Sequence, residues 1–189
     1  MRTTGIYSLY ADVLDYPTPG VFSQLRELSR RTAEIGSEDA SLIQQFEAAL
    51  SGMALTQLQE IYTSSFDMHP DCTPNLGCHL FGEDVRRNIF MARLKEHMDR
   101  AQVPTGAELP DHLSLVLRLL DSPHNEDETQ ALLEDCLVPG VTRILSALEQ
   151  MNGACPYIPA FQALLAKLKN MATAANVGAD LGTDPTQPG

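Results

Sequence analysis

The chain has 189 residues, of which 43% are hydrophobic and 20% are charged, so it is long enough to bury the core of one domain. Its net charge of −12 repels nucleic acid and anionic lipid, because both bind through clusters of lysine and arginine, and makes a basic partner the natural complement. No apolar run reaches the length of about 20 residues that a membrane span needs, and the N-terminus lacks the zones of a secretory signal. Composition therefore predicts a cytoplasmic protein that binds no nucleic acid and does not insert stably into membranes.

Apolar residues recur three and four positions apart through the first third of the chain, which is the spacing of one helix face. This spacing predicts helices over residues 4–14, 18–35, 37–51 and 56–66. Thr56 and Gln59 form a capping-box pattern at the start of the fourth helix. Tyr62 and Phe66 share one face near its end, and they belong either to the core or to one wall of a groove. The sequence alone leaves both interpretations open.

The helical pattern stops between residues 68 and 82, where prolines and glycines interrupt any long regular element. We therefore predict an irregular loop there. The pattern then returns and predicts helices over residues 83–102, 110–121, 126–138, 141–151 and around 161–168. Pro110 stands in the predicted first turn of one of them, where a proline is favoured.

No segment shows the period-two alternation of a β-strand. The predicted fold class is all-α, with about nine helices around one core in a single domain. This domain is expected to span residues 1–175. Glycine, aspartate, threonine and proline dominate residues 176–189, so a disordered tail is expected there.

The predicted loop contains four side chains that can bind metal, namely His69, Cys72, Cys78 and His79. Structural zinc sites usually pair ligands about two to four residues apart and separate the two pairs by a longer finger. The spacing here fits that pattern poorly, and the cysteines do not form a disulfide framework. No metal site is therefore expected, and a zinc-binding helical regulatory module built on this loop is kept as the alternative function.

Patterns typical of catalysis are missing from the sequence. There is no phosphate-binding glycine loop, no His-Glu-x-x-His element and no Gly-x-Ser-x-Gly element. A catalytic cysteine needs a base with an orienting group and an oxyanion site, and the residues around the cysteines do not indicate them. We therefore expect a protein without catalytic activity and without a bound cofactor.

Two short motifs stand at the ends of this part of the chain, Tyr62-x3-Phe66-Asp67 and Glu108-Leu109-Pro110-Asp111-His112. In this order they resemble the redox enzyme maturation chaperones, a helical family, and most of all its nitrate reductase delta-subunit branch. The resemblance covers roughly residues 55–120. It implies a cytoplasmic chaperone that binds the N-terminal leader of a molybdoenzyme catalytic subunit, often a twin-arginine signal or its remnant. Such a chaperone holds the subunit until the molybdenum cofactor is inserted, which makes the cofactor-insertion machinery a second expected partner.

The resemblance places a partner-peptide site on the matching residues, which are Tyr62, Phe66, Asp67, Glu108, Pro110, Asp111 and His112. Arginine–carboxylate bonds are strong, so Asp67 and Asp111 are assigned to the arginines of the leader. The apolar part of the leader is assigned to Tyr62, Phe66, Leu80 and Phe81. Pro110 is expected to fix the start of its helix, and His112 to respond to pH or to orient Asp111.

The identity of the client enzyme stays open at this stage. Residues 69–79, with two cysteines and two prolines, depart from the basic and apolar sequence that the nitrate branch would be expected to carry. The client is therefore a nitrate reductase or another member of the dimethyl sulfoxide reductase superfamily, such as a selenate, chlorate or hydrocarbon-oxidising enzyme.

Overall fold

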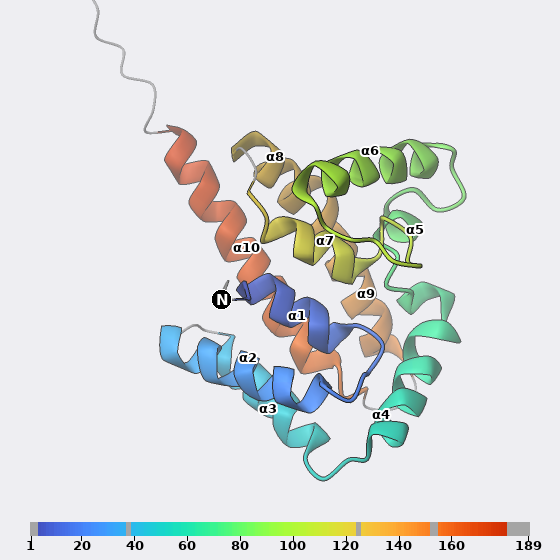
Figure 1. Ribbon diagram of the computed structural model, residues 1–189, viewed down its shortest axis with the longest axis vertical. Coiled ribbons are helices and arrows are strands. Elements are labelled where there is room, and N and C mark those ends of the chain that lie inside the picture. Colours follow the sequence, from blue (N-terminus) through green and yellow to red (C-terminus); the bar gives the residue numbers. More distant parts are fainter. Residues whose placement is uncertain (1–3, 37–38, 124–125, 152–154, 181–189) are drawn as a thin grey trace, which may run out of the picture.

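The computed structural model describes residues 4–36, 39–123, 126–151 and 155–180 (Figure 1). Within these ranges the chain forms helices, and its only β-type pairing is an isolated bridge between Asn75 and His112. The predicted all-α fold is therefore confirmed. Across the same ranges, none of the helices has the length and apolar character that crossing a membrane requires.

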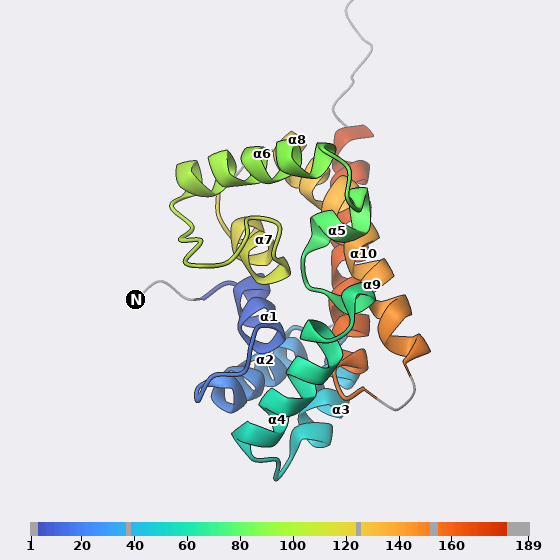
Figure 2. The ribbon, with the colours of Figure 1, turned by 90° about the vertical axis from the view of Figure 1, so that its right-hand side faces the viewer.

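The helices are labelled α1 to α10 in Figure 1. Their bounds are α1 Ile6–Leu14, α2 Val21–Ile35, α3 Ala40–Leu50, α4 Leu55–Tyr62, α5 Leu76–Phe81, α6 Arg86–Ala101, α7 Leu113–Leu120, α8 Glu126–Ala131, α9 Val138–Gln150 and α10 Ile158–Asp180. Two π-helical turns, Thr63–Asp67 and Leu132–Leu137, follow α4 and α8, and a 3₁₀ turn spans Pro70–Cys72. In Figure 2, α9 and α10 run side by side while α6 crosses one end of the molecule.

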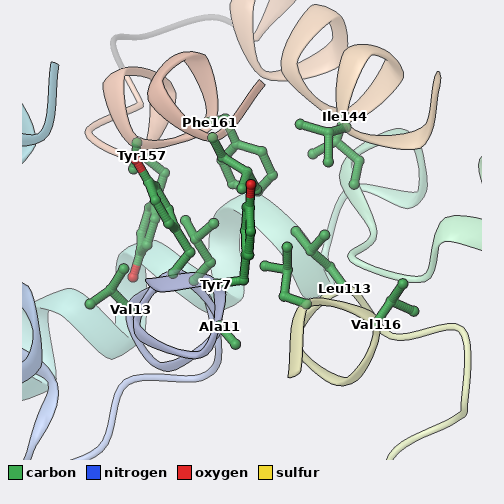
Figure 3. Packing of buried hydrophobic residues seen from close by; sticks show 14 of the residues in the cluster. Tyr7, Ala11, Val13, Leu113, Val116, Ile144, Tyr157 and Phe161 are labelled. Carbon is green, nitrogen blue, oxygen red and sulfur yellow. The ribbon is translucent and has the colours of Figure 1, made fainter. Parts of the chain in front are cut away.

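The helices enclose one hydrophobic core. α1 packs against α2 and α7, and α10 packs against α3 and α9. Figure 3 shows buried side chains of α1, α7, α9 and α10 pointing toward one another, among them Tyr7, Leu113, Ile144 and Phe161. An aromatic cluster with neighbouring ring centroids 4.7–6.0 Å apart joins α3, α4 and α10 through Phe46, Tyr62, Phe66, Tyr157 and Phe161.

The prediction of an irregular loop between residues 68 and 82 was wrong for the part that forms α5. The backbone N–H of Leu76 donates to the carbonyl of Asp111 at 2.8 Å, which ties the first turn of α5 to the segment before α7. Gly77 makes the close approach possible, because a Cβ there would lie 2.5 Å from the Asp111 carboxylate. Contacts with a distant segment thus stabilise a helix that local propensity does not predict.

α7 begins at Leu113, three residues later than the predicted start at Pro110. The carbonyl of Leu109 accepts a hydrogen bond from the N–H of His112 at 2.9 Å, so these residues form a turn with Pro110 in its second position. The fixed φ of proline is favoured there. His112 caps α7, because its Nδ1 accepts from the N–H of Ser114 at 3.3 Å. The proline therefore fixes the turn before the helix rather than its first turn.

The C-terminal helix is longer than predicted. α10 continues to Asp180, so residues 176–180 are helical and do not belong to a disordered tail. The rest of the predicted tail, residues 181–189, lies outside the described residues. The last helix therefore extends five residues beyond the predicted end of the domain at residue 175.

Candidate functional site

A hollow of about 650 Å³ opens where the connections between α1 and α2, α4 and α5, and α6 and α7 meet. Its wall brings together five residues of the two sequence motifs, Tyr62, Phe66, Asp67, Glu108 and His112. It also contains Asp15, Tyr16 and Glu83, which belong to neither sequence motif. We call this hollow the acidic pocket; it is defined by these eight residues together with Pro70, Thr73, Pro74, Asn75, Cys78 and Gly82.

The acidic pocket carries four carboxylates, and none of the lysines and arginines that the structure describes lines it. Asp15 lies 3.7 Å from the guanidinium of Arg118, which partly balances its charge. Asp67, Glu83 and Glu108 are exposed, and among the described residues none of their side chains has an ion-pair or hydrogen-bond partner. The pocket therefore carries uncompensated negative charge, and a cationic side chain is its complement.

Aromatic rings form the inner wall of the acidic pocket. Tyr62 and Phe66 are each only 3% exposed and stand 4.7 Å apart, so both interpretations of these residues hold: they belong to the core, and they line the pocket. Tyr16 is exposed and contacts the ring of Tyr62 edge-on at 5.5 Å. Burial, followed by the charge of Asp15, raises the pKa of Tyr62, so its hydroxyl stays protonated. Aromatic surface beside carboxylates suits a cation such as a guanidinium.

Asp111, which was assigned to an arginine of a partner peptide, does not line the acidic pocket. The residue is 0% exposed, and its Oδ2 lies 2.9 Å from Nε of Arg87 while Oδ1 accepts from the amide of Asn75 at 3.1 Å. The hydrogen bond to Asp111 raises the pKa of Arg87. The carboxylate of Asp111 is thus already bonded to Arg87 of the same chain. It links α6, through Arg87, to Asn75, which precedes α5 and lines the acidic pocket.

Leu80 and Phe81, which were assigned with Tyr62 to the apolar part of the leader, do not line the acidic pocket. The α-helical turn of α5 directs Cys78 to the acidic pocket, whereas Leu80 is half-buried against the core. Phe81 lines a separate hollow of about 440 Å³ between α6 and α8. There its ring stands 5.3 Å from that of Phe90. Successive side chains point in different directions around a helix axis, so Cys78 and Phe81 of α5 face different hollows.

The four potential metal ligands line a third hollow of about 590 Å³, whose walls include His69, Cys72, Cys78, His79, Arg143 and Met151. The thiol of Cys72 contacts the sulfur of Met151 at 3.7 Å, and Nε2–H of His79 donates to the carbonyl of Thr73 at 2.7 Å. Burial raises the pKa of Cys72 and lowers that of His79. In the part of the chain that the structure describes, no three His, Cys, Asp or Glu side chains converge on a metal position. The geometry gives the zinc alternative no support.

The fold and the acidic pocket together define a class of protein, an all-α protein with an acidic recess where its helix connections meet. The family description "nitrate reductase delta subunit" matches residues 32–163. The chain therefore belongs to the nitrate reductase delta subunit family, a family of molybdoenzyme maturation chaperones, and the resemblance drawn from the two motifs is confirmed. No curated protein matches the chain. The matched region contains both motifs and all the pocket residues except Asp15 and Tyr16.

Proposed function

We propose that this chain is a cytoplasmic chaperone that binds the N-terminal leader of the catalytic subunit of a molybdoenzyme of the dimethyl sulfoxide reductase superfamily. The observation that carries the proposal is the set of three unpaired carboxylates in the acidic pocket, Asp67, Glu83 and Glu108. A twin-arginine leader, or its remnant, supplies guanidinium groups, which form strong charge-assisted bonds with carboxylates. Family membership supports the maturation role in general terms.

The three carboxylates come from different connections of the fold and can therefore act on more than one cation. Asp67 ends the π-helical turn after α4, Glu83 follows α5, and Glu108 precedes α7. A guanidinium that packs on the exposed ring of Tyr16 would lie in the same hollow as these carboxylates. Two adjacent arginines can then bond separate carboxylates, which a single acidic residue would not permit.

Holding the leader would keep the catalytic subunit from export or membrane attachment while it is assembled. The chaperone's own residues bind and release the peptide, and the molybdenum cofactor is inserted into the client. The cofactor-insertion machinery is therefore a second partner in this proposal. The carboxylates are exposed, so binding requires no opening of the core, and the net charge of −12 attracts a basic leader from a distance.

The proposal is tested by capture of the client from the native host. A tagged chain is expected to copurify with the precursor of one molybdoenzyme catalytic subunit, which mass spectrometry identifies. Deleting the leader of that subunit is expected to abolish capture. The leaderless client keeps its other surfaces, so any capture that remains measures contacts outside the leader. Equal capture with and without the leader would overturn the proposal, because the binding would then involve another surface.

A further inference from the structure

Three sulfur-bearing side chains come together where the 3₁₀ turn after α4 meets the end of α9 and the segment before α10. Sγ of Cys72, in the 3₁₀ turn, lies 3.7 Å from Sδ of Met151, the residue that follows α9. Sγ of Cys155, three residues before α10, lies 3.6 Å from Oγ of Ser65. Ser65 belongs to the π-helical turn that packs against the 3₁₀ turn. We call Cys72, Met151 and Cys155 the sulfur cluster.

The two cysteines of the sulfur cluster are buried and carry free thiols. Cys72 is 1% exposed and Cys155 is 8% exposed, and neither forms a disulfide. Burial, followed by the charge of Cys155, raises the pKa of Cys72, so the two thiols lie within electrostatic reach of each other. The thiol of Cys72 therefore keeps its proton unless a metal ion displaces it.

The chemistry and spacing of the sulfur cluster suit a soft metal ion. Sulfurs that lie about 2.3 Å from one metal ion stand roughly 3.8–4.0 Å from each other, close to the 3.7 Å between Cys72 and Met151. A structural zinc site takes four ligands from Cys, His, Asp and Glu, and within the described ranges no three such side chains converge. Thiolates and thioethers, by contrast, are the ligands that select Cu(I). Two cysteines and one methionine therefore favour Cu(I) over zinc.

An ion can reach the sulfur cluster from the hollow of about 590 Å³, because Cys72 and Met151 both line it. We propose that the sulfur cluster binds one Cu(I) ion, with Cys72, Met151 and Cys155 as its ligands. Each thiol loses its proton as its bond to copper forms, and the protons pass to solvent. Copper enters and stays as Cu(I), so the step needs no oxidant or reductant. The proposal does not depend on the binding of a leader.

The test measures copper transfer to the purified, reduced, full-length chain in the absence of oxygen. Cu(I) is supplied as its coloured complex with the chelator bicinchoninate, and the loss of colour reports the copper that the chain takes up. Wild type is expected to take up one Cu(I) ion per chain. Cys72→Ser, Cys155→Ser and Met151→Leu are each expected to weaken the affinity at least about tenfold, because each removes one ligand.

Cys78→Ser and Cys136→Ser are the matched controls, because each removes a thiol that lies outside the sulfur cluster. Both are expected to bind copper as wild type does. Met151→Leu conserves the apolar volume, so it tests the ligand while the fold is kept, which circular dichroism checks. X-ray absorption of the loaded chain is expected to show three sulfur neighbours at about 2.3 Å. No uptake by wild type, unchanged affinity in Met151→Leu, or a loss confined to the controls would overturn the proposal.

Discussion

Phe66→Ala is expected to lower the free energy of unfolding by about 3–5 kcal/mol, the cost of removing a large aromatic ring from a packed core. Phe66 is 3% exposed, and its ring centroid lies 4.7 Å from Tyr62, 5.2 Å from Tyr157 and 5.8 Å from Phe161. The ring therefore connects α4 to α10 as well as lining the acidic pocket. Urea denaturation followed by circular dichroism measures the loss.

Two controls separate packing from other effects at this position. Phe66→Leu keeps an apolar side chain and is expected to cost about 1–1.5 kcal/mol. Met68→Ala, two residues along the chain and exposed, is expected to change stability by less than about 0.5 kcal/mol. A loss below about 1 kcal/mol in Phe66→Ala would show that the ring is not in the core. Weak peptide binding by Phe66→Ala should therefore be interpreted only after the free energy of unfolding of this variant has been measured.

Asp111→Ala is expected to lower the free energy of unfolding by about 3 kcal/mol, because it leaves a partly buried arginine without its partner. Asp111 is 0% exposed, and the side chain of Arg87 is 23% exposed. The substitution also removes the acceptor for the amide of Asn75. Thermal and urea unfolding measure the effect, and Glu108→Ala is the matched control, because Glu108 is an exposed carboxylate of the same motif. The control is expected to cost less than about 0.5 kcal/mol.

A double-mutant cycle tests whether the cost of Asp111→Ala comes from its ion pair. Arg87→Met retains the aliphatic packing of the side chain and removes its charge. Each single variant leaves one charge without its partner, whereas the double variant removes both charges. The double variant is therefore expected to lose less stability than the sum of the two single variants. Additive losses would contradict the role assigned to this pair. Asp111 is thus expected to act on peptide binding through the fold rather than by contact.

Helical periodicity allowed most of the fold to be predicted from sequence. The recurring apolar positions that predicted Tyr62 and Phe66 on one face agree with rings that stand 4.7 Å apart. α5 escaped prediction because Pro74 and Gly77 suggest a loop. Its first turn depends on a bond from Leu76 to Asp111, a contact between segments far apart in sequence. Local patterns carry no information about such contacts.

The candidate site was predicted only in part, because local sequence patterns do not show which distant segments meet in the folded chain. Asp67 and Glu108 were found because they belong to recognisable motifs, whereas Asp15 and Glu83 lie in unremarkable connections that meet only in the folded chain. The burial of Asp111 was not foreseen, because a carboxylate near a helix start is favoured there by the helix dipole alone. Its partner Arg87 lies on α6, 24 residues before it in the sequence. The sequence contains no signal that pairs these two residues.

The most direct measurement is calorimetry of a peptide with two adjacent arginines against the variant Asp67→Asn, Glu83→Gln, Glu108→Gln. Three exposed carboxylates outside the acidic pocket provide a control of equal charge change, in the variant Glu60→Gln, Glu96→Gln, Asp135→Asn. Neutralising the pocket is expected to weaken binding at least about tenfold and to reduce its dependence on salt, because charge-assisted bonds are lost. The control is expected to bind almost as wild type does. Equal affinities of the two variants would contradict the claim that the acidic pocket binds the arginines of a leader.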